Sequence, residues 1–428
     1  MQTIKKFLPI FLPVVLIISL LSVALWGKMG EKERADGNEN METDSGAGKT
    51  DAAITEAGIK LENPRIEENG LKVTWDCVWF GSYPQAEVVT KERKENYSAI
   101  KSDYLQEGDL VADDATYAIL ESATDWDANG DITVDGEKYR RIRKKDATRV
   151  TMKRGHSHND YFYDWSDGGT YRYFKYEPVK WRVLSTDGNQ ALLLSDVVLD
   201  NREYNTEWDD IMWETGTIRS WLNGYSASSN KQGIDYSSKN FIDSVFSAEE
   251  QSAIAETTVV NEGSQFDDFA EDGRDTNDKL FLLSESEVYE DTAERYGFDK
   301  DDNIEDKARR AKSSTYAKAM GICWDSSRQY AGSCEWWLRT LDGGDVDDYG
   351  DDGGIWGVGA IYVKAWGDID VLGSDANADC GVRVALNLNM LSNMESSKLY
   401  TYAGTVCRDG AVAEVEPGVK AVSGNAVR

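Results

Sequence analysis

The chain has 428 residues, and its 47 Lys and Arg against 77 Asp and Glu give a formal net charge of −30. This balance argues against nucleic acid or an anionic lipid surface as the main partner, because phosphate binding requires a basic face. The 14 Trp and 21 Tyr exclude a disordered acidic chain and supply apolar surface for a sizeable core. The two histidines, His156 and His158, disfavour His-based catalysis over most of the sequence.

The N-terminus has the pattern of an export signal. Lys5 and Lys6 precede an uncharged apolar run from Phe7 to Gly27. This run also reaches the length of about 20 residues that spans a bilayer. We therefore expect residues 1–27 to be a signal peptide or an uncleaved signal-anchor helix, and both alternatives stay open. The expected location is outside the cell, secreted or anchored at the cell surface, with membrane contact through this helix if it is not cleaved.

Residues 28–60 form a polar linker rich in Glu, Asp, Gly and Thr. The first predicted strand follows at Leu71–Trp79, where large apolar residues alternate with polar ones. Two further strands are predicted at Val179–Ser185 and Gln190–Ser195. The turn residues Asp187–Asn189 between them predict a hairpin.

Helices are predicted after this hairpin. Trp213–Leu222 has apolar residues on one helical face and ends at Asn223-Gly224. Ser247–Glu250 and Ser284–Glu287 have the spacing of capping boxes, each opening a short helix. Helices and strands therefore mix without a regular βαβ alternation, which predicts an α+β fold.

Several motifs carry a resemblance to a known family, and their order along the chain is specific. They are Phe80–Gln85, Trp181–Leu184, Ala191–Ser195, Trp213–Thr215, Ile218–Asn223, Phe246–Glu250, Trp336–Arg339 and Gly381–Leu386. This series resembles the DUF6273 domains of exported bacterial proteins, which are frequent in gut Firmicutes. The resemblance implies, by analogy, a C-type-lectin-like fold.

The resemblance also sets the domain boundaries. It predicts a globular domain over residues 61–391 with a long β-rich insertion at 86–176. Residues 392–428 are expected to form a C-terminal extension that ends in a disordered tail from Glu414 to Arg428.

Metal sites are weakly indicated. Asp125, Asp127 and Asn129 match early positions of an EF-hand-like Ca²⁺ loop, but Gly136 stands where that loop needs a carboxylate. A polar β-turn is the favoured interpretation of this segment. Ca²⁺ is the cofactor that it would bind under the alternative interpretation. His156 and His158 could hold zinc or nickel, although a polar loop is favoured there.

Five cysteines occur, at positions 77, 323, 334, 380 and 407. An exported protein permits disulfides, and the odd count leaves one thiol over. Cys77 falls on the apolar side of its strand, so we expect a buried thiol there. Cys323 with Cys334 is the first disulfide pair to test.

The segment Thr340–Cys380 holds ten Asp and no Glu, with aromatic residues interleaved. Aromatic rings offer stacking area and carboxylates offer hydrogen-bond acceptors, so this pattern predicts a ligand surface. A set of turns explains the Asp and Gly equally well, and the two interpretations are compatible. The candidate ligand-binding residues are Trp336, Trp337, Arg339, Asp345, Asp347, Asp348, Tyr349, Asp351, Asp352, Trp356, Tyr362, Trp366 and Asp368.

The expected function is recognition of an extracellular glycan, peptide or protein, without nucleic acid as a partner. A structural or assembly role in the cell envelope and a carboxylate-based hydrolase are the alternatives. No catalytic residue can be named among 77 acidic ones.

Overall fold

The computed structural model of the protein describes the chain from Leu61 onward. The expected signal or anchor segment (1–27), the linker (28–60) and both histidines lie outside the described residues. Within the part that is described, no helix is long and apolar enough to cross a membrane. The described residues are 61–67, 72–101, 108–148, 160–161, 163–165, 169–209, 211–265, 270–300, 306–325, 330, 332–342, 359–390, 398–407 and 420–423.

The described strands form one large, mostly antiparallel sheet. Its main path runs β12-β20-β8-β7-β2-β21-β22, with β1 and β3 on β2 and the β4–β5 hairpin on β7. The predicted hairpin is confirmed, since β7 and β8 pair antiparallel across the turn at Gly188. The bounds are β1 Arg65–Glu67, β2 Lys72–Val89, β3 Leu110–Ala112, β4 Asp131–Val134, β5 Glu137–Ile142, β7 Arg172–Asp187, β8 Gln190–Ser195, β12 Leu280–Phe281, β20 Ala385–Asn389, β21 Lys398–Cys407 and β22 Lys420–Ser423.

Strands β2 and β7 are the longest pair and connect the core with the insertion. Their pairing extends from Cys77 opposite Arg182 to Val88 opposite Tyr173. The register shifts after Trp79, where Gly81 has φ +68° and lies so close to Phe246 that a Cβ would approach its ring to 2.5 Å. A bulge with glycine at this position lets the strand bend as it leaves the core.

A second sheet has five strands in the order β18-β17-β16-β19-β9. Strand β16 is buried along its whole length, so it has no solvent face. Strands β17 and β18 pair antiparallel as a hairpin at one edge of this sheet. The bounds are β9 Asp200–Glu203, β16 Trp336–Leu341, β17 Gly359–Val363, β18 Ile369–Asp375 and β19 Asp379–Val382.

Short two-stranded pieces complete the described strands. The pairs are β10 Thr257–Val259 with β11 Thr276–Asp278, β13 Ala311–Lys312 with β15 Ser333–Cys334, and β6 Asp160–Tyr161 with β14 Trp324–Asp325.

The helices are short, and the capping signals in the sequence place several of them. Ser247 and Ser284 form the predicted capping boxes of α5 and α6. Helix α3 ends at Gly224, which has the left-handed conformation expected of a C-terminal glycine. The bounds are α1 Lys91–Lys101, α2 Asp114–Ser122, α3 Thr217–Asn223, α4 Phe241–Val245, α5 Ala248–Ala253, α6 Glu285–Val288, α7 Glu290–Tyr296 and α8 Thr315–Met320, with 3₁₀ turns η2 Lys144–Asp146, η3 Trp213–Thr215 and η4 Ala227–Ser229.

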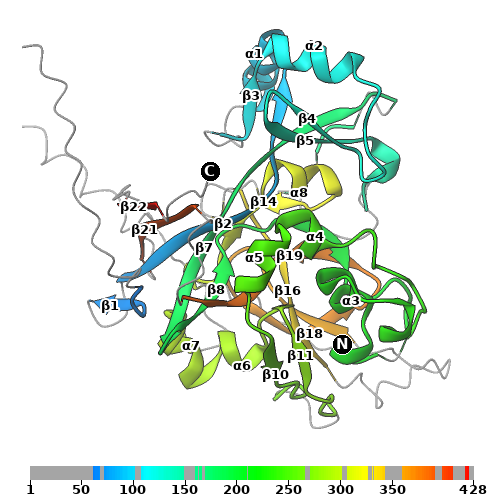
Figure 1. The fold of residues 1–428 in the computed structure, drawn as a ribbon. Coiled ribbons are helices and arrows are strands. Elements are labelled where there is room, and N and C mark those ends of the chain that lie inside the picture. The colour runs from blue at the N-terminus through cyan, green and yellow to red at the C-terminus, as the bar shows by residue number, and fades with distance from the viewer. Residues whose placement is uncertain are drawn as a thin grey trace, which may run out of the picture. The chain divides into compact units, whose positions relative to one another are not determined.

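The insertion is mixed rather than β-rich, since α1 and α2 accompany its short strands. It has a small apolar cluster of its own, formed by Val88, Leu120, Tyr139 and Tyr173. Figure 1 shows α1, α2, β3, β4 and β5 together at one end, where β2 and β7 lead past α8, with α6 and α7 at the other end. The insertion is therefore a subdomain built on the ends of strands β2 and β7 that extend beyond the core.

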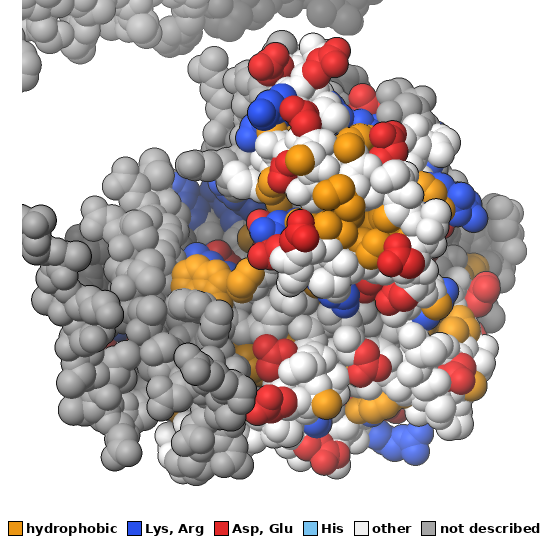
Figure 2. Space-filling model, turned by 45° about the horizontal axis from the view of Figure 1, so that its top comes forward, with side chains coloured by type: hydrophobic (Ala, Val, Ile, Leu, Met, Phe, Trp, Pro, Cys, Tyr) orange, Lys and Arg blue, Asp and Glu red, His pale blue; other side chains and the backbone are white. Residues whose placement is uncertain are grey.

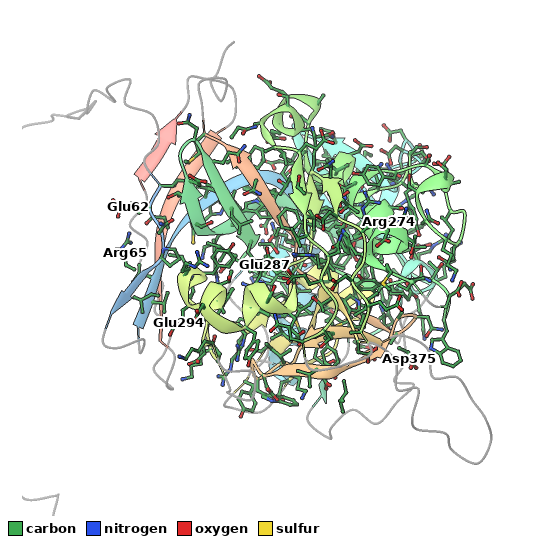
Figure 3. The ribbon with its side chains drawn as sticks, turned by 90° about the horizontal axis from the view of Figure 1, so that it is seen from below. Glu62, Arg65, Arg274, Glu287, Glu294 and Asp375 are labelled. Carbon is green, nitrogen blue, oxygen red and sulfur yellow. The ribbon has the colours of Figure 1, made fainter. Side chains whose placement is uncertain are left out.

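The C-terminal extension contributes to the large sheet. Strand β21 pairs with β2 from Lys72 opposite Cys407 to Trp79 opposite Tyr400, and β22 pairs with β21. Part of the expected tail, Lys420–Ser423, is therefore a strand. At the start of the same sheet, Arg65 pairs with Glu62 at 3.2 Å and with Asp76 at 3.3 Å; Figure 3 shows Glu62 and Arg65 side by side near β1.

Candidate functional site

The first part of the predicted ligand segment belongs to the core. Trp336 and Trp337 are fully buried, and their indole N–H groups donate to the carbonyls of Arg309 at 3.1 Å and Arg202 at 2.9 Å. Arg339 is also buried, and its guanidinium binds the Glu287 carboxylate and the carbonyls of Val260 and Leu282. Figure 3 labels Glu287 on α6. The prediction that these three residues contact a ligand is wrong, because their side chains are enclosed and already paired.

The second part forms a hairpin that is paired within itself. The Tyr362 hydroxyl donates to Asp370 at 2.9 Å, and the Trp366 N–H lies 3.4 Å from the Asp368 carboxylate. Lys364 lies 3.2 Å from Asp368 and 3.4 Å from Asp370. These carboxylates thus have a cation of the same hairpin as partner. Asp345, Asp347, Asp348, Tyr349, Asp351, Asp352 and Trp356 lie outside the described residues, so their role stays a prediction.

The Ca²⁺-like segment is a turn held by one carboxylate. Asp127 Oδ1 accepts the N–H groups of Asn129 and Asp131, both at 2.8 Å. Gly130 follows with φ +78° and leads into β4. Asp125 has no part in these bonds. Among the described residues no cluster of three or more His, Cys, Asp or Glu could hold a metal ion.

Cys77, Cys323, Cys334 and Cys380 are buried. Cys77, Cys334 and Cys380 have free thiols, so the Cys323–Cys334 disulfide is not formed. Burial raises the pKa of the Cys77 and Cys334 thiols to about 12. They are therefore neutral, poorly nucleophilic side chains of the core.

A cavity of about 380 Å³ lies between the insertion and the core. This volume is within the range of about 300–1,000 Å³ that is usual for small-molecule sites. The insertion lines it with Asp127, Ala128, Asn129, Gly130, Arg140, Arg141, Ile142, Arg143, Asp146 and Tyr171, and the rest of the chain with Tyr83, Arg202, Trp221, Lys239, Asn240, Ser244, Tyr316 and Met320.

The insertion wall presents two arginines stacked on aromatic rings. Arg141 and Arg143 are two positions apart in an extended segment, so they project to the same side. Their guanidinium carbons lie 4.4 and 4.6 Å from the centre of the Tyr171 ring. Arg141 also lies 4.7 Å from the centre of Trp126. Cation–π contacts of this kind orient the charged groups without neutralising them.

The core wall holds Arg202, which β9 carries into the cavity from the second sheet. Its guanidinium carbon lies 4.5 Å from the centre of the Trp221 ring on α3. Its Nε is buried and has no hydrogen-bond partner. Burial opposes the charge, but the nearby Asp200 carboxylate together with Tyr83, Tyr316 and Glu203 outweighs this and raises the pKa of Arg202. A buried donor without an acceptor costs about 1–3 kcal/mol.

The back of the cavity is rigid and fully paired. Arg140 donates to both oxygens of Asp131, at 2.6 and 2.9 Å, and Tyr176 donates to the same carboxylate at 2.7 Å. Tyr83 donates to Asp200 at 2.6 Å. Burial raises the pKa of Tyr316 to about 12, so this phenol is neutral. These side chains form a fixed floor behind the arginines of the two walls.

Charge distinguishes this cavity from the chain that encloses it. Five cationic side chains line it (Arg140, Arg141, Arg143, Arg202 and Lys239) against the carboxylates of Asp127 and Asp146. Elsewhere the acidic side chains prevail; Figure 2 shows Asp and Glu scattered over the described surface rather than gathered in one patch. The cavity is thus an inward basic site in a protein of net charge −30.

Comparisons with known proteins found a family model that matches one part of the chain. Residues 188–390 match the family model described as "Domain of unknown function (DUF6273)". This match supports the family that the motifs predicted, and it includes Arg202, Trp221, Lys239 and Tyr316 of the cavity. No curated protein and no solved structure matches the chain significantly. The insertion wall lies outside the matched range, so the cavity joins a family domain to a segment that its model does not cover.

The sequence contained one signal of this site. Tyr139–Lys145 places five cations among seven residues of an acidic chain. Arg202 had no such signal, because it stands alone between Asn201 and Glu203. More than fifty residues separate Arg141 and Arg143 of the insertion wall from Arg202 of the core wall. No sequence motif could therefore show that these side chains line one cavity.

Proposed function

We propose that the protein is a recognition module that holds an anionic ligand in the cavity between the insertion and the core. One observation carries this proposal. The cavity gathers arginines that stack on aromatic rings, and among the described residues two of them, Arg141 and Arg202, have no carboxylate within ion-pair distance. Arginine suits this role because its planar fork matches oxyanions.

The proposal keeps the extracellular location expected from the sequence. Residues 1–27 have the composition of an export signal, and the resemblance of the sequence motifs implies an exported bacterial protein of C-type-lectin-like fold. The ligand proposed for this setting is an anionic glycan or a small molecule. The proposed site is the cavity instead of residues 336–368. Binding rather than turnover is the proposed activity.

Isothermal titration calorimetry of the full-length chain with four probes tests the proposal. The probes are glucose, glucuronate, glucose 6-sulfate and glucose 6-phosphate. We expect at least one anionic sugar to bind and neutral glucose not to bind. Arg202→Gln should weaken that binding roughly tenfold or more, because a charged hydrogen bond contributes about 1.5–3 kcal/mol.

Arg274→Gln is the matched control, since this side chain is 86% exposed and is not among the residues lining the cavity. Its affinity should equal that of the unchanged chain. Arg141→Gln repeats the test on the insertion wall if Arg202→Gln folds poorly. Absence of binding by every anionic probe, or binding that neither cavity variant weakens, would overturn the proposal.

A further inference from the structure

The cations of the cavity exceed what its own carboxylates can neutralise. Arg140 is neutralised by Asp131, and Arg143 lies 3.6 Å from Asp146. Among the described residues, no carboxylate lies within ion-pair distance of Arg141, Arg202 or Lys239. Two carboxylates are left to set against these three cations: the lining Asp127, whose Oδ1 already accepts two backbone N–H groups, and the buried Asp200 near Arg202, which accepts the Tyr83 hydroxyl. The lining therefore keeps an excess of positive charge, which suits an anionic group.

The donors also come from two separate parts of the fold. Arg141 and Arg143 belong to the insertion, whereas Arg202 and Lys239 belong to the core. A carboxylate offers two oxygens in one plane, which a single arginine fork can satisfy. A tetrahedral oxyanion offers oxygens in several directions and can accept from both walls at once. The arrangement of the cavity thus favours a tetrahedral group over a planar one.

The arginines of both walls are held in place before any ligand binds. Tyr171 contacts both Arg141 and Arg143, and Trp221 contacts Arg202. Side chains that are already ordered lose little conformational entropy on binding. Such pre-organisation distinguishes a built anion site from flexible surface cations.

The volume indicates more than a bare anion. At about 30 Å³ for each water in the liquid, 380 Å³ corresponds to about a dozen water volumes. This leaves room for a polar group such as a sugar ring attached to the oxyanion. Neutral hydrogen-bonding groups for its hydroxyls are present in Asn129 and Ser244.

We infer that the cavity recognises a phosphoryl dianion, preferably as the phosphate monoester of a small polar molecule. This inference rests on the proposed function and narrows its ligand class. A sulfate ester has the same tetrahedral geometry but a single negative charge, and inorganic phosphate has the charge without the attached group. These two ligands therefore separate the contributions of charge and of the attached group.

The experiment compares glucose 6-phosphate, glucose 6-sulfate, glucuronate and inorganic phosphate at pH 7.5 and pH 5.0, by calorimetry on the full-length chain. A phosphate monoester loses its second proton near pH 6, so its dianion fraction falls about tenfold between these values. No histidine is among the lining residues. Any effect of pH on the protein itself would act on the sulfate and phosphate esters alike.

We expect glucose 6-phosphate to bind about tenfold more tightly than the other probes at pH 7.5. Its affinity should fall about tenfold relative to that of the sulfate ester at pH 5.0. The double variant Arg141→Gln/Arg202→Gln should abolish this preference, and Arg274→Gln should keep it.

Two results would overturn the inference alone. Equal or tighter binding of glucuronate or of the sulfate ester, with loss of that binding in Arg202→Gln, would leave the proposed function in place. A phosphate affinity that follows the sulfate affinity between the two pH values would likewise refute the dianion. Absence of binding by all anionic probes would overturn the inference and the proposed function together.

Discussion

The β17–β18 hairpin and the cavity contain the same kinds of side chain in opposite states of pairing. In the hairpin, Asp368 and Asp370 share Lys364, and Tyr362 donates to Asp370. In the cavity, Arg141 and Arg202 contact aromatic rings and no carboxylate among the described residues. The charged side chains of the hairpin are paired with one another. In the cavity, by contrast, Arg141 and Arg202 are cations that could pair with a ligand. Both regions are conspicuous by their composition. They differ in whether their charged side chains are paired within the protein.

The largest expected effect is a loss of stability on substitution of Trp337, a residue that we predicted from the sequence to contact the ligand. Trp337→Ala should lower the free energy of unfolding by about 3–5 kcal/mol, because it opens a cavity in a fully buried strand. It also removes the hydrogen bond to the Arg202 carbonyl. Urea unfolding measures the change.

Trp208→Ala is the control, since this tryptophan is 50% exposed and should cost much less. A loss below about 1 kcal/mol for Trp337→Ala would contradict the assignment of Trp337 to the core.

The second effect concerns the paired floor of the cavity. Asp131→Asn should destabilise the chain by about 3 kcal/mol at pH 7, because the buried Arg140 loses its counter-charge. Burial opposes the charge of Asp131, but its bonds with Arg140 outweigh this and lower its pKa below the usual 3.8. The stabilisation is therefore complete above pH 3.8 and is lost as the pH falls below it.

Urea unfolding at pH 7 and pH 3 should show the difference between the unchanged chain and Asp131→Asn shrinking at the lower pH. Asp135→Asn, an exposed carboxylate in the turn of the same hairpin, should change stability by less than about 0.5 kcal/mol at either pH. A difference that grows on acidification would show that Asp131 is not a stabilising anion.

The smallest effect on stability is expected at Arg141, one of the proposed ligand-binding arginines. Arg141→Gln removes cation–π contacts with Tyr171 and Trp126, which contribute about 0.5–1 kcal/mol each at exposed sites. Thermal unfolding should therefore change little while anion affinity falls. A loss above about 2 kcal/mol would make Arg141 a structural residue like Arg339.

Local signals in the sequence predicted local structure well. The alternation in β2, the turn between β7 and β8, and the serine caps of α5 and α6 are all confirmed. Each of these features depends on residues close together in the chain. The same holds for the Asp127 turn, where a carboxylate accepts N–H groups two and four residues ahead.

The prediction was wrong where pairing between distant residues decides the outcome. Trp336 and Trp337 are adjacent and point to opposite faces of β16, and both faces are buried. An aromatic pair of this kind looks like a ligand surface in sequence. Arg339 looked like a surface cation because its partners, Glu287 and Val260, are more than fifty residues away. The cavity escaped prediction for the same reason, since its walls come together only in the folded chain.

The continuity of β2 and β7 determines whether the insertion can be deleted from this protein or transferred to another. These strands remain paired from the core to Val88 and Tyr173, and β5 then pairs with β7 at Tyr173 and Phe174. The insertion is therefore joined to the core through a shared hydrogen-bond ladder and not through a hinge. Deleting it would leave backbone donors and acceptors without partners along two strands, a template for self-association. The segment cannot be treated as a removable cassette, and grafting the cavity onto another scaffold would require both long strands to be transferred with it.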